Sequence, residues 1–239
     1  MKIAVILTQY KRPYLKKQLE SIKSQTLQLH YLIVFQNENH INIESLKQEY
    51  KFIHIQNEFN TKYFGRFAFC MNIPADIFIV MDDDIIPGKK YLENVVGECV
   101  RLNGIIGGNG RIGYLNTKIN KELHYKNAND IGYRQHTKLV DFVGHCWTFK
   151  KDWLHYMFAV KPLTYETGED MHFCYASKVL GGISSYVAKQ TNNDEVCDIT
   201  ENKLAIDEHA NFRRSGITDL RIEIEKYWIN KGLKTIENN

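Results

Sequence analysis

The chain has 239 residues, of which 44% are hydrophobic and 25% are charged, and its formal net charge is +3. These are ordinary values for a folded domain, and a chain of this length buries a core without disulfides or a structural metal. The small charge and the scattered basic residues argue against nucleic acid as a partner. Because no apolar run approaches the length of a bilayer crossing, we expect no membrane span.

The five cysteines are odd in number and far apart, and no Cys-x-x-Cys pair occurs. This spacing indicates neither a zinc site nor a disulfide framework. The first apolar run, residues 3–7, is too short for the apolar region of a signal peptide. We therefore expect a reducing compartment and a cytoplasmic location.

Short apolar runs alternate with amphipathic segments over the first part of the chain. The runs are rich in β-branched and aromatic residues and predict buried strands at 2–7, 31–35, 52–56 and 77–81. Apolar residues at helical spacing predict helices at 14–22, 44–50 and 64–71. Strands that alternate with helices predict a mainly parallel sheet with helices on both faces. The polar loops that follow these strands then gather at one edge of the sheet.

The second part of the chain continues the α/β pattern less regularly. The expected elements are a helix at 91–100, a short strand with a flexible turn at 104–110, a strand at 140–149, helices at 151–157, 170–180 and 217–228, and a strand at 184–188. Residues 115–138 have weak periodicity and are interpreted as a long connection, an active-site flap. Gly144 suggests a bulge or a close approach of a ligand. No repeat or linker divides the chain.

Three aspartates, Asp82, Asp83 and Asp84, directly follow the buried run at 77–81. Adjacent carboxylates repel one another unless a cation neutralises them. Open α/β sheets bind ligands beyond the carboxyl ends of their strands, which is where this triplet is expected. Oxygen ligands alone favour a hard cation such as Mg²⁺ or Mn²⁺. The pattern favours a metal site, and a solvated acidic turn is the alternative.

Five segments resemble, in family order, the exostosin-like family 64 of glycosyltransferases with a GT-A fold. They are Thr-Gln-Tyr-Lys-Arg at 8–12, Val-Phe-Gln-Asn at 34–37, Arg66, Val-Met-Asp-Asp-Asp at 80–84 and Gly-Glu-Asp-Met at 168–171. The resemblance implies one half-Rossmann-like domain over 1–239. Residues 1–84 would form its nucleotide-binding half and residues 85–239 its acceptor-binding half.

The resemblance also implies an activity and its cofactor. A hexose or N-acetylhexosamine would move from a UDP-sugar to a glycan or another hydroxyl acceptor, with Mn²⁺ or Mg²⁺ bound. Asp84 would be the direct metal ligand and Asp82 a second candidate metal ligand. Asp82 would also face the ribose, and Asp83 would face the sugar. Donor contacts are implied for Arg12, Asn37, Arg66 and Asn60 or its neighbour Thr61.

Glu169 and Asp170 are the candidate catalytic carboxylates. The resemblance places Asp170 beside the reacting sugar carbon, and Glu169 stands where an aspartate is common in the family. A carboxylate there stabilises the electron-poor carbon or takes the proton of the acceptor, while a metal ion and arginine offset the charge of the leaving diphosphate. We expect retention of configuration. The alternative is an inverting, family 2-like enzyme with Asp170 as the general base.

Several candidate residues have a second interpretation. Arg12 and Arg66 are alternatively surface cations, Asn37 a turn residue and Asp170 a helix N-cap. His209 is a further candidate metal ligand, with an ordinary loop histidine as the alternative.

His145 is a candidate for the acceptor cleft, two residues before Trp147, which we expect to pack in the core. Two other functions compete with glycosyl transfer. A sugar nucleotidyltransferase needs a glycine-rich phosphate loop after the first strand, and residues 8–13 contain no glycine. A non-catalytic carbohydrate-binding protein is disfavoured by the intact aspartates.

Overall fold

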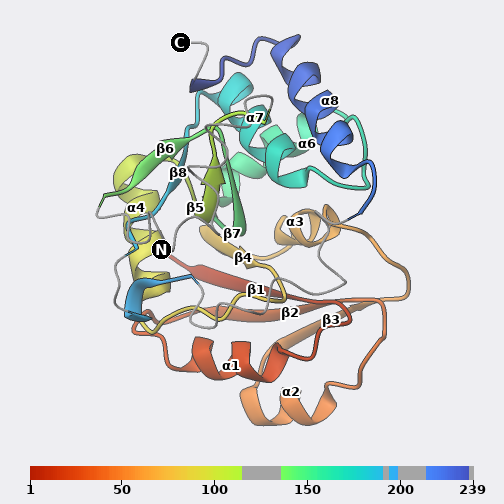
Figure 1. The fold of residues 1–239 in the computed structure, drawn as a ribbon. Coiled ribbons are helices and arrows are strands. Elements are labelled where there is room, and N and C mark those ends of the chain that lie inside the picture. The colour runs from red at the N-terminus through yellow and green to blue at the C-terminus, as the bar shows by residue number, and fades with distance from the viewer. Residues whose placement is uncertain (115–135, 191–193, 199–213, 237–239) are drawn as a thin grey trace.

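The computed structural model describes residues 1–114, 136–190, 194–198 and 214–236. These residues form one eight-stranded sheet with helices packed around it (Figure 1), in the strand order β3-β2-β1-β4-β7-β5-β8-β6. The strands are β1 (Ile3–Gln9), β2 (Tyr31–Asn37), β3 (Ile53–Asn57), β4 (Ile77–Met81), β5 (Ile105–Arg111), β6 (Lys138–Val140), β7 (Phe142–Lys150) and β8 (Ser185–Val187).

The sheet is mainly parallel. β3, β2, β1 and β4 all run in the same direction, and β5 is parallel to β8. β7 is antiparallel to both of its neighbours, β4 and β5, and β6 is antiparallel to β8. Because β1, β2 and β4 are parallel, their carboxyl ends share one edge, where residues 8–12, Asn37 and the three aspartates lie.

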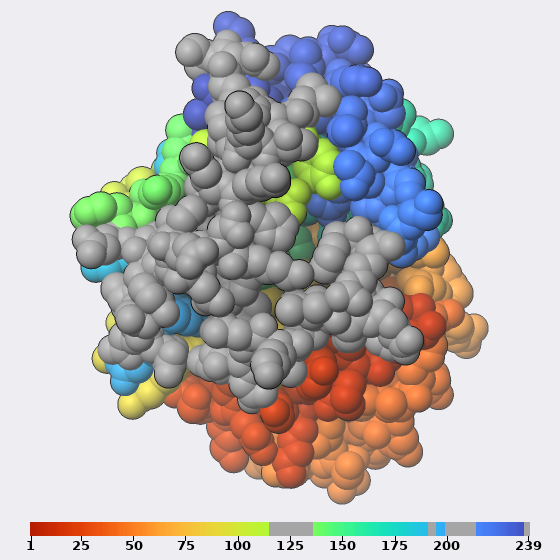
Figure 2. Space-filling model, in the orientation of Figure 1, coloured from red at the N-terminus to blue at the C-terminus, as the bar shows by residue number. Residues whose placement is uncertain are grey.

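The helices cover both faces of the sheet. Figure 1 shows α1 and α2 on one side of β1, β2 and β3, and α3 on the other side, with α6, α7 and α8 packed together beyond it. The helices are α1 (Leu15–Lys23), α2 (Glu44–Tyr50), α3 (Gly65–Cys70), α4 (Tyr91–Leu102), α6 (Leu154–Ala159), α7 (Glu169–Gly181) and α8 (Ile217–Ile229), with short 3₁₀ helices η2 (Lys151–Trp153) and η3 (Asp194–Val196). Figure 2, in the same orientation, shows the N-terminal segments in red and orange below and the residues of α8 in blue above.

The core explains why β4 is the centre of the sheet. All five residues of β4 are buried, as the unbroken apolar run predicts for a strand covered on both faces. Phe78 stacks on Phe149 of β7, and Phe67 of α3 packs against Phe149 and Phe173 of α7. The predicted α/β domain with a mainly parallel sheet and helices on both faces is confirmed.

The segment predicted as a short strand with a turn at 104–110 is instead a continuous strand, β5. Its glycines are there for close packing rather than for a turn. A Cβ at Gly107 would lie 2.3 Å from Cβ of Val143, and one at Gly110 would lie 2.5 Å from a methyl carbon of Val187. Only glycine lets the neighbouring strands approach this closely.

The single strand predicted at 140–149 is divided into β6 and β7. Asp141 separates them, and its carboxylate accepts hydrogen bonds from the backbone N–H groups of Gly113 and Ile236. The irregularity suggested at Gly144 lies directly after it. The register between β5 and β7 shifts between the pairs Asn109–Gly144 and Gly107–Trp147, and His145 has a φ of 67°.

Two other expectations concern the whole chain. All five cysteines are free thiols, and four of them are buried. Within the described part of the chain, every helix is too short or too polar to cross a bilayer. Most of the predicted flap, residues 115–135, lies outside the described residues.

Candidate active site

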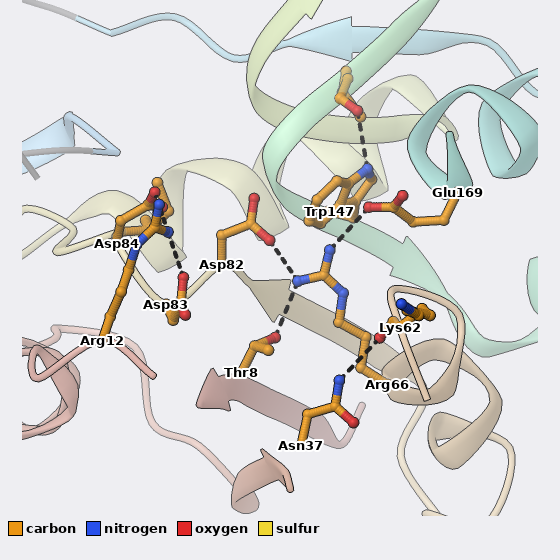
Figure 3. Close-up of polar contacts among 12 residues, drawn as sticks. Thr8, Arg12, Asn37, Lys62, Arg66, Asp82, Asp83, Asp84, Trp147 and Glu169 are labelled. Atoms are coloured by element: carbon orange, nitrogen blue, oxygen red, sulfur yellow. Dashed lines mark hydrogen bonds and ion pairs between the residues drawn. The ribbon is translucent and has the colours of Figure 1, made fainter. Parts of the chain in front are cut away.

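The three aspartates lie where β4 ends, and Arg12 reaches them from the loop after β1. Nη1 of Arg12 lies 2.6 Å from Oδ1 of Asp83 and 2.6 Å from Oδ2 of Asp84 (Figure 3). Arg12 is only 8% exposed, so its interpretation as a surface cation is wrong. Gln18 of α1 donates hydrogen bonds to the carbonyl oxygens of Asp82 and Ile85, which fixes the backbone of the triplet.

The aspartates are short of positive charge. Burial, opposed by Arg12, raises the pKa of Asp83 to about 7, and burial together with the charge of Asp82 raises the pKa of Asp84. Each shift means that the ionised carboxylate is disfavoured in this environment. A cation bound here would favour ionisation, and carboxylate oxygens suit Mg²⁺ or Mn²⁺. The carboxylates of Asp83 and Asp84 therefore suit a divalent cation that has further ligands from outside the chain.

Arg66 is the centre of the candidate site. From α3 its guanidinium contacts Oδ1 of Asp82 at 2.5 Å, Oγ1 of Thr8 at 3.0 Å and Oε1 of Glu169 at 3.1 Å. The guanidinium also lies over the ring of Trp147, 4.7 Å from its centroid (Figure 3). Arg66 is 2% exposed, so it is not a helix-surface ion-pair partner. Burial alone would lower its pKa, but Asp82 and Glu169 raise it.

Glu169 and Asp170 begin α7. Gly168 occupies the N-cap position with φ of 78°, so the interpretation of Asp170 as the N-cap is wrong. Oδ1 of Asp170 accepts a hydrogen bond from the backbone N–H of Met171, and Oδ2 lies 3.2 Å from Nη1 of Arg221 on α8. Asp170 is 7% exposed. Its carboxylate is therefore held in place from two sides.

Glu169 has a different environment from that of its neighbour. Burial and the charge of Asp170 raise its pKa to about 7, while Arg66 and Arg221 oppose the shift. One carboxylate oxygen binds Arg66, and the other, Oε2, is buried without a hydrogen-bond partner. Both candidate carboxylates are thus bound to an arginine, Glu169 to Arg66 and Asp170 to Arg221.

Asn37 and Asn60 form a second, adjacent cluster. The amide nitrogen of Asn37 donates to Oδ1 of Asn60 and to the carbonyl oxygen of Lys62, and its amide oxygen accepts from the backbone N–H and the hydroxyl of Thr61. These bonds tie the end of β2 to the loop before α3. The structure therefore places Asn37 and Asn60, the two predicted donor contacts, next to each other. Asn37 also stabilises the loop before α3 through its hydrogen bonds.

His145 lies on β7 beside the end of β4, and its partner was not evident in the sequence. Its Nδ1 lies 2.9 Å from Oδ2 of Asp198, a fully buried carboxylate. Its carbonyl oxygen accepts a hydrogen bond from the backbone N–H of Asp82. Burial lowers the pKa of His145, but the nearby carboxylates Asp198, Asp84 and Asp82 raise it overall.

Other contacts of the site residues were not evident from the sequence. Thr8 and Trp147 contact Arg66, and Arg221 contacts Asp170. Among the described residues, no three His, Cys, Asp or Glu side chains are grouped so as to hold a metal ion by themselves. His209, the further candidate ligand, lies outside the described residues.

Solved structures with a similar fold include those of S. aureus TarS. One TarS structure has a TM-score of 0.51 and 16% identity over 79% of this chain and 37% of its own. The structure of TarS 1–349 has a TM-score of 0.55 and 14% identity over 79% of this chain and 60% of its own. The complex of TarS 1–349 with UDP-GlcNAc has a TM-score of 0.53 and 14% identity over 82% of this chain and 60% of its own.

This chain thus spans less than two thirds of the TarS chains, and at such low identity the likeness shows the fold alone. No curated protein sequence matches the chain. The prediction of a GT-A glycosyltransferase is confirmed, whereas the closer likeness to family 64 finds no support in these matches. A family model described as Glycosyl transferase family 2 matches residues 4–158, well over half of the sequence, so the chain belongs to this family.

Proposed function

We propose that the chain is a metal-dependent glycosyltransferase that moves a hexose or N-acetylhexosamine from a UDP-sugar to a hydroxyl group of a glycan or another acceptor. The observation that carries the proposal is Arg66, which binds Asp82 after β4 and Glu169 beside Asp170 at the same time. Arg66 thus holds together two parts of the site. One is the acidic triplet, which suits a metal-bound donor diphosphate, and the other is the pair Glu169 and Asp170, which suits proton transfer from an acceptor hydroxyl. Membership of family 2 supports the same reaction class.

Several residues of the site would bind the donor. Asp83 and Asp84 would hold Mn²⁺ or Mg²⁺, which offsets the charge of the leaving diphosphate when it is bound. Arg12 would exchange one of these carboxylates for a donor phosphate oxygen, because both are anionic partners of similar geometry. Asp82, Asn37 and Asn60 would lie toward the nucleoside, at the carboxyl ends of the strands.

Asp170 would act as the general base. We propose inversion rather than the retention expected from the family 64 resemblance, because the matching family is family 2. The proton of the acceptor hydroxyl would pass to Oδ1 or Oδ2 of Asp170 as the acceptor oxygen bonds to the sugar carbon and the bond to the diphosphate breaks. Arg221 and the backbone N–H of Met171 would hold this carboxylate in its orientation.

Asp170→Asn tests this assignment. We expect turnover to fall by about 10²-fold or more with UDP affinity unchanged, because general-base catalysis contributes about 10²–10⁴-fold and acts on the transition state. Asp152→Asn, a change on the 3₁₀ helix η2, is the matched control. Near-normal turnover of the Asp170 variant would exclude Asp170 as the base.

Donor screening separates the competing functions. UDP-sugars are tested with and without Mn²⁺ for binding by thermal shift and for slow hydrolysis. A non-catalytic carbohydrate-binding protein would show no Mn²⁺-dependent hydrolysis. Proton NMR of the first product then decides the stereochemistry, since an α-linked product from an α-linked donor would contradict inversion.

The five free thiols support the expectation of a reducing compartment.

A further inference from the structure

Two arginines from distant parts of the chain meet beside Asp170. Arg111 ends β5 and Arg221 lies on α8, and their guanidinium carbons stand 5.4 Å and 5.9 Å from the centroid of the same ring, that of Tyr114. Arg221 also contacts Oδ2 of Asp170 at 3.2 Å. The ring of Tyr114 therefore links Arg111 to the arginine that contacts the candidate base.

This group of residues has more positive than negative charge. Among the described residues, Asp170 is the one carboxylate within ion-pair distance of Arg221, and none lies within that distance of Arg111. Glu169 is already bound to Arg66. Nε of Arg221 is buried without a hydrogen-bond partner. Burial and the nearby charge of Arg221 lower the pKa of Arg111. Burial lowers the pKa of Arg221, but Asp170 and Glu169 raise it overall, so Arg111 is the member of the pair whose charge an added anion would stabilise.

Arg221 is held in this position by the packing of α8. Cδ1 of Ile224 lies so close to Gly168 that a Cβ there would approach it to 2.3 Å. Further along the helix, Tyr175 donates a hydrogen bond to Glu225, and Trp228 packs edge-on against a histidine of α7. Because these contacts fix α8 against α7, the guanidinium of Arg221 is placed before any ligand binds. Such preorganisation is what a recognition site requires.

We propose that Arg111 and Arg221 form a subsite for an anionic group of the acceptor, a phosphate or a carboxylate next to the hydroxyl that receives the sugar. The proposal rests on the proposed function, since it takes Asp170 as the base. A planar guanidinium pairs with phosphate or carboxylate through two parallel hydrogen bonds. Two guanidinium groups that bind the same anion would fix the orientation of the acceptor.

The experiment compares matched probes that differ only in charge. Binding of glycerol phosphate is measured against glycerol, and of glucuronic acid against glucose, by NMR titration of the protein with and without saturating UDP and Mn²⁺. We expect the anionic member of at least one pair to bind roughly tenfold or more tightly than its neutral partner. The phosphate pair and the carboxylate pair tell the two sources of negative charge apart.

Variants then assign the preference to the arginines. Arg111→Gln should reduce the preference to less than about threefold, while Arg111→Lys, which keeps the charge but loses the paired hydrogen bonds, should retain only part of it. Arg101→Gln is the control, because Arg101 is exposed on α4 and pairs with Glu98. Circular dichroism confirms that each variant is folded. UDP affinity should be the same in all of them, since the donor is bound by other residues.

Three results would overturn the subsite. The parent protein could bind charged and neutral probes equally, the Arg111→Gln variant could keep the full preference, or that variant could lose UDP affinity, which would assign the arginine to the donor diphosphate. Failure of the proposed function has a different signature: the parent would bind no UDP and hydrolyse no UDP-sugar. The probe titrations without UDP decide the anion site separately from that outcome.

Discussion

Arg66→Met tests whether the buried arginine keeps Glu169 ionised. Methionine retains an unbranched side chain against Trp147 but removes the charge and the hydrogen bonds to Asp82 and Glu169. The side chain of Asp82 is 31% exposed and regains water, so its loss of a partner costs little. The side chain of Glu169 is 6% exposed and cannot rehydrate, so it takes up a proton instead.

The size of the effect follows from the pKa of Glu169. In the parent this pKa is about 7, raised from 4.5 by burial and by Asp170. Because the folded-state pKa lies above the ordinary value, Glu169 lowers the free energy of unfolding as pH rises from 4.5 to about 7, with no further change above that range. Without Arg66 the pKa rises further, so the variant continues to lose stability above pH 7. One pH unit corresponds to about 1.4 kcal/mol, so the stability loss should be about 1.4 kcal/mol larger at pH 8 than at pH 6.

The assay is urea unfolding at both pH values, followed by the fluorescence of the three tryptophans, all of which are buried. A pH-independent loss of about 1–3 kcal/mol from the missing hydrogen bonds is expected as well. The double variant Arg66→Met, Glu169→Gln should lose the pH-dependent part, because the side chain at position 169 no longer titrates. A stability loss of equal size at pH 6 and pH 8 in the single variant would refute the reasoning.

Two further predictions concern the metal and the turn before α7. Asp84→Ala should abolish the Mn²⁺ dependence of UDP binding measured by calorimetry. The control Asp76→Ala, a change at an exposed carboxylate before β4, should leave this dependence intact. If the Asp84 variant and the parent bound UDP with the same Mn²⁺-dependent affinity, Asp84 would not be part of the metal site. Gly168→Ala should lower the free energy of unfolding by about 2–4 kcal/mol, because its φ is 78° and the new Cβ would meet Ile224. Gly216→Ala has a similar φ of 79° but open space around it, and should lose only about 1 kcal/mol; similar losses in both would show that the contact with Ile224 does not matter.

The strands and helices could be predicted where local sequence carries the signal. The run at β4 is apolar throughout because both faces of the strand are covered, and α2 has the predicted bounds, 44–50. Prediction failed at β5, because a glycine that makes room for Val143 on the neighbouring strand looks the same in sequence as a glycine in a turn. The difference lies in which strand is adjacent, and this is a property of the folded sheet.

The candidate site likewise contains residues that local sequence indicates and residues whose role depends on the folded structure. Asp84 could be nominated because a carboxylate directly after a buried strand has a local context, and Asp170 could be nominated through the family resemblance. The burial of Arg66 beneath both carboxylate groups could not be predicted, since it depends on how α3 packs against β7. Arg111 and Arg221 had no signal at all, because arginines at the end of a strand and on an amphipathic helix are ordinary surface residues in most sequences.

The antiparallel insertion of β7 between β4 and β5 has a consequence for biosynthesis. β4 ends at Met81 and β7 starts only at Phe142, so one edge of the N-terminal sheet has no partner while the intervening residues are made. At about 5–20 residues per second, this edge stays open for several seconds on the ribosome. β5 leaves the ribosome before either of its partners, β7 and β8. An open edge next to a strand as apolar as β4 is a template for pairing with other nascent chains. The growing polypeptide is therefore most vulnerable to aggregation before β7 is complete, and this interval is when a chaperone would have the greatest effect on yield.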